Sequence, residues 1–139
     1  MNREIIFRLW DKDTQKLYAD VGLTQRDNKP FRYSYEVTSR HIMEPVYKIY
    51  SKPDKYELMQ YIGVKDLTGK KIFEGDIVSI SCLYKVDLPG IVGFHEARYV
   101  VFSRCPERTV EHVFTEVEVN CKIFGNMYEN PELLEEERE

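Results

Sequence analysis

The sequence predicts an all-β or mainly β fold. Short runs alternate between apolar and polar residues, polar turns separate them, and almost no stretch follows the helical period. Ten Tyr and seven Phe also favour sheet, because aromatic side chains suit a half-buried, pleated surface. Between about residues 56 and 125 the order of strands and turns predicts a small SH3-like barrel, with additional N-terminal strands beside it and a short C-terminal helix.

A chain of 139 residues, 42% hydrophobic and 32% charged, is expected to form a single globular domain. Two lobes are the alternative: an N-terminal β region over residues 1–50 and a barrel over 56–130, joined by the polar, proline-containing segment 51–55. Residues 131–139 form an acidic C-terminal tail. From residue 129 onward six Glu and one Arg contribute −5 to the net charge of −4, which leaves +1 for the remainder. That remainder lacks the basic excess of a general polyanion binder.

The cysteines, the N-terminus and the hydropathy favour a reduced cytoplasm. Cys82, Cys105 and Cys121 contain no CxxC pair. Met1 is followed by a short strand-like run rather than by the apolar core of a signal peptide. No apolar stretch reaches the roughly 20 residues that span a membrane. We therefore expect a cytoplasmic protein with no membrane partner.

The first fifty residues predict four strands. Residues 4–10 alternate loosely, and residues 17–21 return as the second arm of a hairpin. Residues 31–38 alternate cleanly between aromatic or apolar and polar side chains, which predicts a strand with one wet face. Pro45 disfavours a helix at that point, so residues 46–50 are expected to form a short strand.

The central stretch predicts a strand, a loop, a short strand, a tight turn and another strand. Aromatic and β-branched residues fill residues 56–62. A hairpin loop follows, in which Gly69 supplies a positive φ. The apolar pair Ile72-Phe73 comes next, and Gly75 supplies a positive φ in the tight turn. Side chains then alternate along residues 78–82.

Three further strands are expected, at residues 91–94, 97–102 and 116–124. A turn at residues 87–90 precedes the first of them, and Gly93 within it indicates a bulge or a close approach of another group to the backbone. Gly125 and Asn126 are expected to end the last strand. Asn130 followed by Pro131 predicts the start of the short helix, with Asn130 as its N-cap.

Stretches at both ends and in the middle of the chain carry a family resemblance. They are REIIFRLWDKDTQKLY at residues 3–18, LMQYIGVKDLTGKKIFEGDIV at 58–78 and IFGNMYENPELL at 123–134. Together they resemble the YopX family of phage- and prophage-encoded proteins. The resemblance implies a phage-related β protein that acts inside a bacterial host, and it supplies no catalytic residue to transfer.

Two short patterns bear on catalysis and phosphate binding. Glu74 and Asp76, two residues apart around a glycine, could flank a metal or a sugar, but an Asp at such a turn commonly bonds to nearby backbone. The glycines of residues 63–71 are separated by five residues, where a phosphate-binding loop has four, and no hydroxyl follows the lysines. A hairpin loop is therefore the better interpretation of residues 63–71.

His95, Cys105, His112 and Cys121 include metal-ligand types. Their gaps of ten, seven and nine residues differ from the short paired spacings of structural zinc sites. Cys121 lies on the apolar face of its strand and is expected in the core. Spacing gives no sign that any Cys and His meet as a nucleophile pair. We therefore expect no metal, no cofactor and no catalytic residues.

Tyrosines between residues 31 and 61 could form a stacking platform for single-stranded nucleic acid, with Lys48, Lys52 and Lys55 nearby. Packing in the core and at sheet edges is the alternative, and the missing basic excess favours it. The weak candidates for binding residues are Tyr33, Tyr35, Lys48, Tyr50, Lys52, Glu74 and Asp76.

Three functions are compatible with the sequence. The first is a non-enzymatic protein-interaction or self-assembling β module, expected to be a homo-oligomer, because many short strands leave edges that can pair with other chains. Its protein partners are not identified by the sequence. The second is a nucleic-acid-binding module that uses the Tyr and Lys residues between 31 and 55. The third, and weakest, is a small hydrolase or nuclease that uses Glu74 and Asp76.

Overall fold

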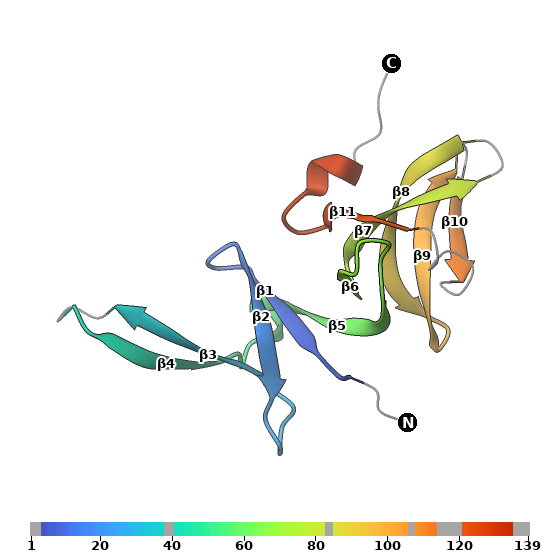
Figure 1. Ribbon diagram of the computed structural model, residues 1–139. Helices are drawn as coiled ribbons and strands as arrows, with labels where there is room; N and C mark the ends of the chain where they lie inside the picture. The colour runs from blue at the N-terminus through green and yellow to red at the C-terminus, as the bar shows by residue number, and fades with distance from the viewer. Residues whose placement is uncertain (1–3, 38–40, 83–84, 106–107, 114–120, 135–139) are drawn as a thin grey trace. The chain divides into compact units, whose positions relative to one another are not determined.

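The chain is mainly β, as the alternating patterns predict. A computed structural model describes residues 4–37, 41–82, 85–105, 108–113 and 121–134 (Figure 1). The structure divides into two compact units. The N-terminal unit comprises Ile5–Gln60, and the C-terminal unit comprises the chain from Tyr61 onward together with the first four residues. The division falls inside one strand, β5 (Tyr56–Lys65).

The N-terminal unit is an antiparallel sheet with strand order β4-β3-β2-β1-β5. Its strands are β1 (Phe7–Asp11), β2 (Lys16–Leu23), β3 (Pro30–Val37), β4 (Met43–Ile49) and the first half of β5. A single 3-10 turn, η1 (Pro53–Lys55), leads into β5. The core of this unit is built on Leu9, Val21 and Tyr50, and partly buried aromatic and aliphatic side chains pack against them. Leu9 comes from the loosely alternating run 4–10. It is fully buried, so the face of β1 that carries Leu9 is the one that packs into the core.

Strands β3 and β4 form a two-stranded arm. They pair along seven positions, from Phe31 opposite Ile49 to Val37 opposite Met43. In contrast, the described pairing of β3 with β2 is limited to two positions at the base of the arm. Figure 1 shows the arm extending away from β2. At the base, the Phe31 ring lies over Gly22, where an added Cβ would come within 2.6 Å of the ring, so no larger residue fits there without a shift.

The C-terminal unit contains a second antiparallel sheet with strand order β10-β9-β8-β7-β11. Its strands are β7 (Asp76–Cys82), β8 (Lys85–His95), β9 (Arg98–Cys105), β10 (Arg108–Val113) and β11 (Ile123–Asn126). The second half of β5 pairs with β6 (Lys71–Phe73) in a hairpin. The core is formed by Ile62, Ile72, Val78, Val92, Val101 and Cys121. The buried position of Cys121 agrees with its place on an apolar strand face.

The expected SH3-like barrel is not what the described residues form. The five-stranded sheet is open, because its two edge strands, β10 and β11, are separated by three strands and do not pair with each other in the described part of the chain. The β5–β6 hairpin belongs to the other sheet, whose full strand order is β4-β3-β2-β1-β5-β6. Turn spacing predicted most of the strands, but it missed β10 and only part of β8 was expected. Closure depends on pairing between strands distant in sequence, which turn spacing does not reveal.

Two expected turns lie inside strands instead. Pro89 and Gly90 belong to β8, where Pro89 pairs with Ser79 of β7. A proline is tolerated there because the described pairing with β9 begins one residue later, at Gly90, so its missing N–H costs no bond to that strand. Gly125 and Asn126 likewise belong to β11. The expected close approach at Gly93 is confirmed, since an added Cβ would lie 2.9 Å from the Phe102 ring.

The C-terminal helix is reduced to one 3-10 turn, η2 (Pro131–Leu134). The Asn130 Oδ1 accepts a hydrogen bond from the backbone N–H of Asn126 at 3.2 Å, and the Asn130 backbone carbonyl accepts one from the Leu133 N–H at 3.1 Å. Leu133 is exposed, so it does not provide the docking that a longer helix would need. Residues 116–120 of the expected strand 116–124 and the charged end 135–139 lie outside the described residues.

Asp66 fastens the β5–β6 loop to β11. Its Oδ1 accepts hydrogen bonds from Thr68 N, Thr68 Oγ1 and Lys70 N, and its Oδ2 accepts one from Ile123 N at 3.0 Å. Burial alone would raise the pKa of Asp66, but these hydrogen bonds outweigh burial and lower the pKa to about 2. The hairpin loop predicted for residues 63–71 is therefore confirmed, with Gly69 at φ +87°, and a carboxylate rather than a phosphate organises it.

Candidate functional site

The N-terminal unit carries an open cleft of about 220 Å³. It forms where the end of β1, the turn after it, the end of β4 and the segment leading to η1 come together. Eight residues line it: Asp11, Asp13, Lys48, Ile49, Tyr50, Ser51, Lys52 and Lys55. Three of the eight are lysines and two are aspartates, so the lining is charged but close to balance.

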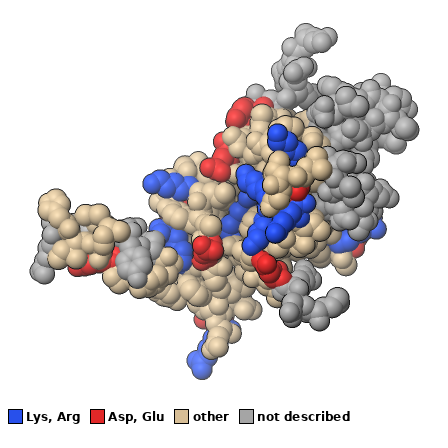
Figure 2. Space-filling model, in the orientation of Figure 1, with Lys and Arg blue, Asp and Glu red and all other residues tan. Residues whose placement is uncertain are grey.

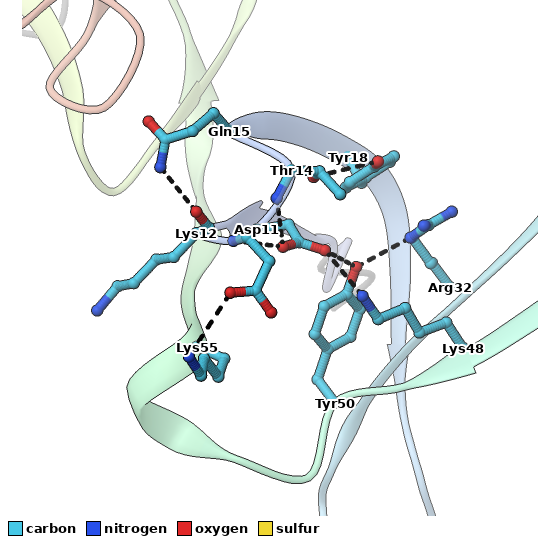
Figure 3. Close-up of polar contacts among 10 residues, drawn as sticks. Asp11, Lys12, Thr14, Gln15, Tyr18, Arg32, Lys48, Tyr50 and Lys55 are labelled. Atoms are coloured by element: carbon cyan, nitrogen blue, oxygen red, sulfur yellow. Dashed lines mark hydrogen bonds and ion pairs between the residues drawn. The ribbon is translucent and has the colours of Figure 1, made fainter.

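Asp11 is the centre of a buried hydrogen-bond network at the wall of this cleft (Figure 3). Its Oδ1 accepts hydrogen bonds from the backbone N–H groups of Asp13 and Thr14, at 2.9 and 3.1 Å. Its Oδ2 accepts hydrogen bonds from Lys48 Nζ at 3.1 Å and from the Tyr50 hydroxyl at 2.9 Å. Because the residue is only 1% exposed, these partners replace the water that would otherwise solvate the charge.

Tyr50 extends the network to β3 and β2. Arg32 Nε donates a hydrogen bond to the Tyr50 hydroxyl at 2.9 Å, and the Arg32 guanidinium lies 3.9 Å from the centre of the Tyr18 ring. Lys48 Nζ lies 4.7 Å from the centre of the Tyr50 ring. Burial and the bond to Asp11 raise the pKa of Tyr50 to about 12, although Arg32 opposes this. The network therefore ties β1, β2, β3 and β4 together at the base of the arm.

The pKa of Asp11 gives the network a defined pH dependence. Burial would raise this pKa, but hydrogen bonds from Thr14, Tyr50 and Lys48 outweigh burial and lower it to about 2, from 3.8. A pKa lowered by folding contributes stability that is present above the unfolded-state value and is lost as pH falls through the folded-state value.

We therefore expect stability to fall between about pH 4 and pH 2, by roughly 2 kcal/mol for each of Asp11 and Asp66. Urea unfolding measured at pH 5, 4, 3 and 2.5 tests this. The Asp11→Asn variant is the control and should have a shallower loss. A stability that stays level or rises from pH 5 to pH 2.5 would contradict the assignment.

The rim of the cleft is less tightly held than its wall. Lys55 Nζ lies 3.7 Å from Asp13 Oδ1, and the side chains of both residues are at least half exposed. Lys52 forms no ion pair with another described residue. Its charge therefore remains available at the mouth of the cleft.

The arm presents an apolar face that the N-terminal unit leaves uncovered. The register places three cross-strand pairs on it: Phe31 with Ile49, Tyr33 with Tyr47, and Val37 with Met43. Five of these side chains are 44–64% exposed: Tyr33, Val37, Met43, Tyr47 and Ile49. The arm, at the left of Figure 2, is accordingly largely free of charge colours. Arg32 and Lys48, which pair with each other, occupy the opposite face.

A family comparison identifies the chain. The model described as "YopX protein" matches residues 6–135, which is nearly the whole chain. This chain belongs to the YopX family. Two solved structures agree with the fold, and the comparison with curated proteins finds no match.

The first YopX-like structure is that of protein EF1440 from Enterococcus faecalis, with a TM-score of 0.60 and 23% identity, covering 96% of this chain and 100% of that chain. The second is yopX from Bacillus subtilis, with a TM-score of 0.54 and 20% identity, covering 96% and 98%. At these identities the likeness shows the fold alone.

In this YopX-family chain the residues singled out from sequence lie in three places. Lys48, Tyr50 and Lys52 meet at the cleft. Tyr33 lies on the apolar face of the arm, away from the lysines. Tyr35 pairs with Pro45 in the arm ladder, and its side chain lies outside the described atoms.

Glu74 and Asp76 belong to the C-terminal unit and are not among the residues that line the cleft. Asp76 is 2% exposed, and its Oδ2 accepts a hydrogen bond from the backbone N–H of Phe73 at 2.8 Å. Gly75, between the two acidic residues, has φ +85°, as the turn requires. The Asp76 carboxylate therefore serves its own turn, which is the structural role expected of Asp after Gly.

Within the described ranges no three His, Cys, Asp or Glu side chains gather to hold a metal ion. The side chains of Cys105 and His112 are not among the described atoms. No described helix has the length and apolar character needed to cross a membrane.

The sequence also drew attention to Lys55, but it did not indicate the remaining residues of the cleft, above all Asp11. Asp11, Asp13 and Thr14 follow a strand, and that pattern predicts a turn in which the first Asp bonds to nearby backbone N–H groups. The local half of the network could therefore be found from sequence. Its contacts with Lys48 and Tyr50, 37 and 39 residues further along, have no sequence signal.

Proposed function

We propose that this YopX-family chain is a non-enzymatic protein-interaction module that self-assembles through the apolar face of the arm. The observation that carries the proposal is the exposure of five large apolar side chains on one face of a two-stranded ribbon. Monomeric soluble proteins rarely expose a contiguous apolar patch of more than a few hundred Å² unless it binds something.

Energetics support a partner for the arm. A two-stranded ribbon is marginal in water by itself, and beyond its base the described part of β3 has only β4 beside it. Five half-exposed side chains offer on the order of 100 Å² each, or roughly 500 Å² per copy. Two arms packed face to face would bury about 1,000 Å², which is the lower limit for a specific interface.

A second copy of the chain is the partner that the arm fits best. The described cross-strand pairs on this face contain no charged residue, so a matching surface must be flat, apolar and two residues wide. The same face of another copy meets that description, and a two-fold arrangement would cover both arms at once. The family resemblance leads us to place this assembly in the cytoplasm of a bacterial host, as the product of a phage or prophage.

Other functions have weaker support from the geometry. Stacking of nucleic-acid bases would use Tyr33 and Tyr47, yet Lys48 lies on the opposite face of the ribbon, so rings and cation do not form one surface. A hydrolase would need the carboxylate of Asp76, which is buried and bonded to its own turn.

The double variant Met43→Thr/Tyr47→Thr should be a monomer where the wild-type protein is assembled. Thr keeps the strand propensity of β4 while removing apolar contact area, so the arm should persist. Light scattering coupled to gel filtration measures the molar mass. Loading concentrations from about 1 to 100 μM span the dissociation constants of typical weak and moderate dimers.

The matched control is Leu67→Thr, which removes an equally exposed apolar side chain from the β5–β6 loop. It should leave the molar mass unchanged. A wild-type protein that is monomeric at every concentration would overturn self-assembly through the arm. So would a double variant with the same assembled mass as the wild type.

A further inference from the structure

We propose that the cleft beside Asp11 binds a small phosphate-bearing anion, held by Lys48, Lys52 and Lys55. Of the exposed residues on the arm's apolar face only Ile49 also lines the cleft, and Lys48 lies on the opposite side of the ribbon, so this site can be tested separately from the self-assembly proposed above. Four properties of the cleft lead to an anion of this class.

The first property is that the carboxylate in the wall is already fully used. Four hydrogen bonds occupy the two oxygens of Asp11, which is buried. A metal cation entering the cleft would have to displace the turn N–H groups or the Tyr50 hydroxyl from that carboxylate. The lining therefore offers a cation only Asp13, whereas it offers an anion three ammonium groups.

The second property is that one ammonium group is held in position before any ligand arrives. The bond to Asp11 Oδ2 and the ring of Tyr50 fix Lys48 Nζ. An ammonium group has three donors, and Asp11 takes one of them. The other two can serve a ligand without the entropy loss of ordering a free lysine side chain.

The third property is that the outer lysines can be recruited at little cost. Lys52 has no ion pair with a described residue, and the separation of 3.7 Å between Lys55 and Asp13 exceeds a charged hydrogen bond. Such exposed pairs contribute little stability, so an anion can take Lys55 from Asp13. Pro53 lies between the two lysines in η1, and its fixed φ limits the motion of the segment.

The fourth property is size. About 220 Å³ admits a phosphate group with a small organic substituent, but the eight lining residues come from one face of one unit, so a large ligand would remain mostly in solvent. Lysines arranged as separate point charges suit a doubly charged phosphate, and planar carboxylates are usually bound by the fork of an arginine.

Nuclear magnetic resonance of the uniformly ¹⁵N-labelled full chain tests the proposal. Inorganic phosphate is titrated at a mildly alkaline pH, where its doubly charged form predominates, with sodium chloride adjusted to hold ionic strength constant. We expect saturable shifts of the amide signals of residues 50–52 and 54–56, with an apparent Kd of order millimolar (about 1 mM).

Lys52→Gln should weaken phosphate binding about tenfold, since a hydrogen bond from a charged group is lost. The matched control is Lys16→Gln, which removes an exposed lysine of the same unit outside the cleft lining. It should leave the Kd unchanged, and both variants should keep the wild-type melting temperature.

Three outcomes would overturn the site. They are shifts that sodium chloride alone reproduces, no saturation with phosphate, and equal weakening by Lys16→Gln and Lys52→Gln. A single-stranded oligonucleotide forms a separate arm of the experiment. Binding of the oligonucleotide through residues 50–56 without binding of inorganic phosphate would replace a small-anion site by a nucleic-acid site.

Discussion

Replacing Asp11 with Ala is expected to lower the free energy of unfolding by about 3–5 kcal/mol. The change removes a buried carboxylate that holds four donors, and it leaves Lys48 and the Tyr50 hydroxyl without their acceptor. The melting temperature should fall by roughly 10 °C or more, at about 3–6 °C per kcal/mol for a chain of this size. Urea unfolding followed by circular dichroism gives the free energy directly.

Two further variants separate the contribution of the Asp11 charge from that of its hydrogen bonds to the turn and from the general effect of removing a carboxylate. Asp13→Ala removes a neighbouring carboxylate that is 61% exposed and weakly paired, so it should cost less than about 1 kcal/mol. Asp11→Asn keeps an oxygen for the turn N–H groups but loses the charge that Lys48 needs, so its effect should lie between the two. If Asp11→Ala and Asp13→Ala were equally mild, Asp11 would not organise the N-terminal unit.

Replacing Asp66 with Ala is expected to cost about 2–4 kcal/mol in the C-terminal unit. Its carboxylate joins the β5–β6 loop to the backbone of Ile123, so the change frees the start of β11 as well as the loop. Cys121 and Leu67 share a backbone hydrogen bond beside this link, and it should weaken too. Hydrogen exchange of the Ile123 and Lys70 amides, compared with core amides of β9, reports the local opening.

Thr68→Val is the matched control, because it removes one of the four hydrogen bonds while keeping the carboxylate and the shape of the side chain. It should cost about 1 kcal/mol. A loss as large as that of Asp66→Ala would mean that the Thr68 hydroxyl, rather than the link to β11, stabilises the loop.

Period-two alternation predicted most of the described strands, because it reports the side of a strand that faces apolar surroundings. It did not predict β10. The strand predicted from the clean alternation of residues 31–38 corresponds to β3, and the strands predicted in the central stretch correspond to β5, β6 and β7. Alternation does not report what covers an apolar face. Tyr33 and Val37 therefore looked like ordinary strand residues, whereas they lie exposed on the arm.

The candidate site was less accessible to sequence for a different physical reason. Asp11 and Asp66 both stand in polar, turn-like segments, where an exposed carboxylate is the usual expectation. Both are buried, and their oxygens are satisfied by donors of their own turn together with distant groups, which are the Lys48 and Tyr50 side chains for Asp11 and the Ile123 backbone N–H for Asp66. The donors come partly from the same turn, which local chemistry can predict, and partly from strands that only tertiary pairing brings close. The proline of β8 failed as a turn marker for the same reason, because strand pairing overrode a local preference.

The boundary between the two units has a consequence for how such a chain can be inherited. Independent domains are exchanged between proteins at exposed linkers, where cutting or joining the chain disturbs little. Here the boundary lies within β5, among the buried residues Met59, Tyr61 and Ile62. A break there would place charged chain ends in an apolar environment, which is costly. The two units are therefore expected to pass from one genome to another as a single indivisible segment, whatever genes surround it.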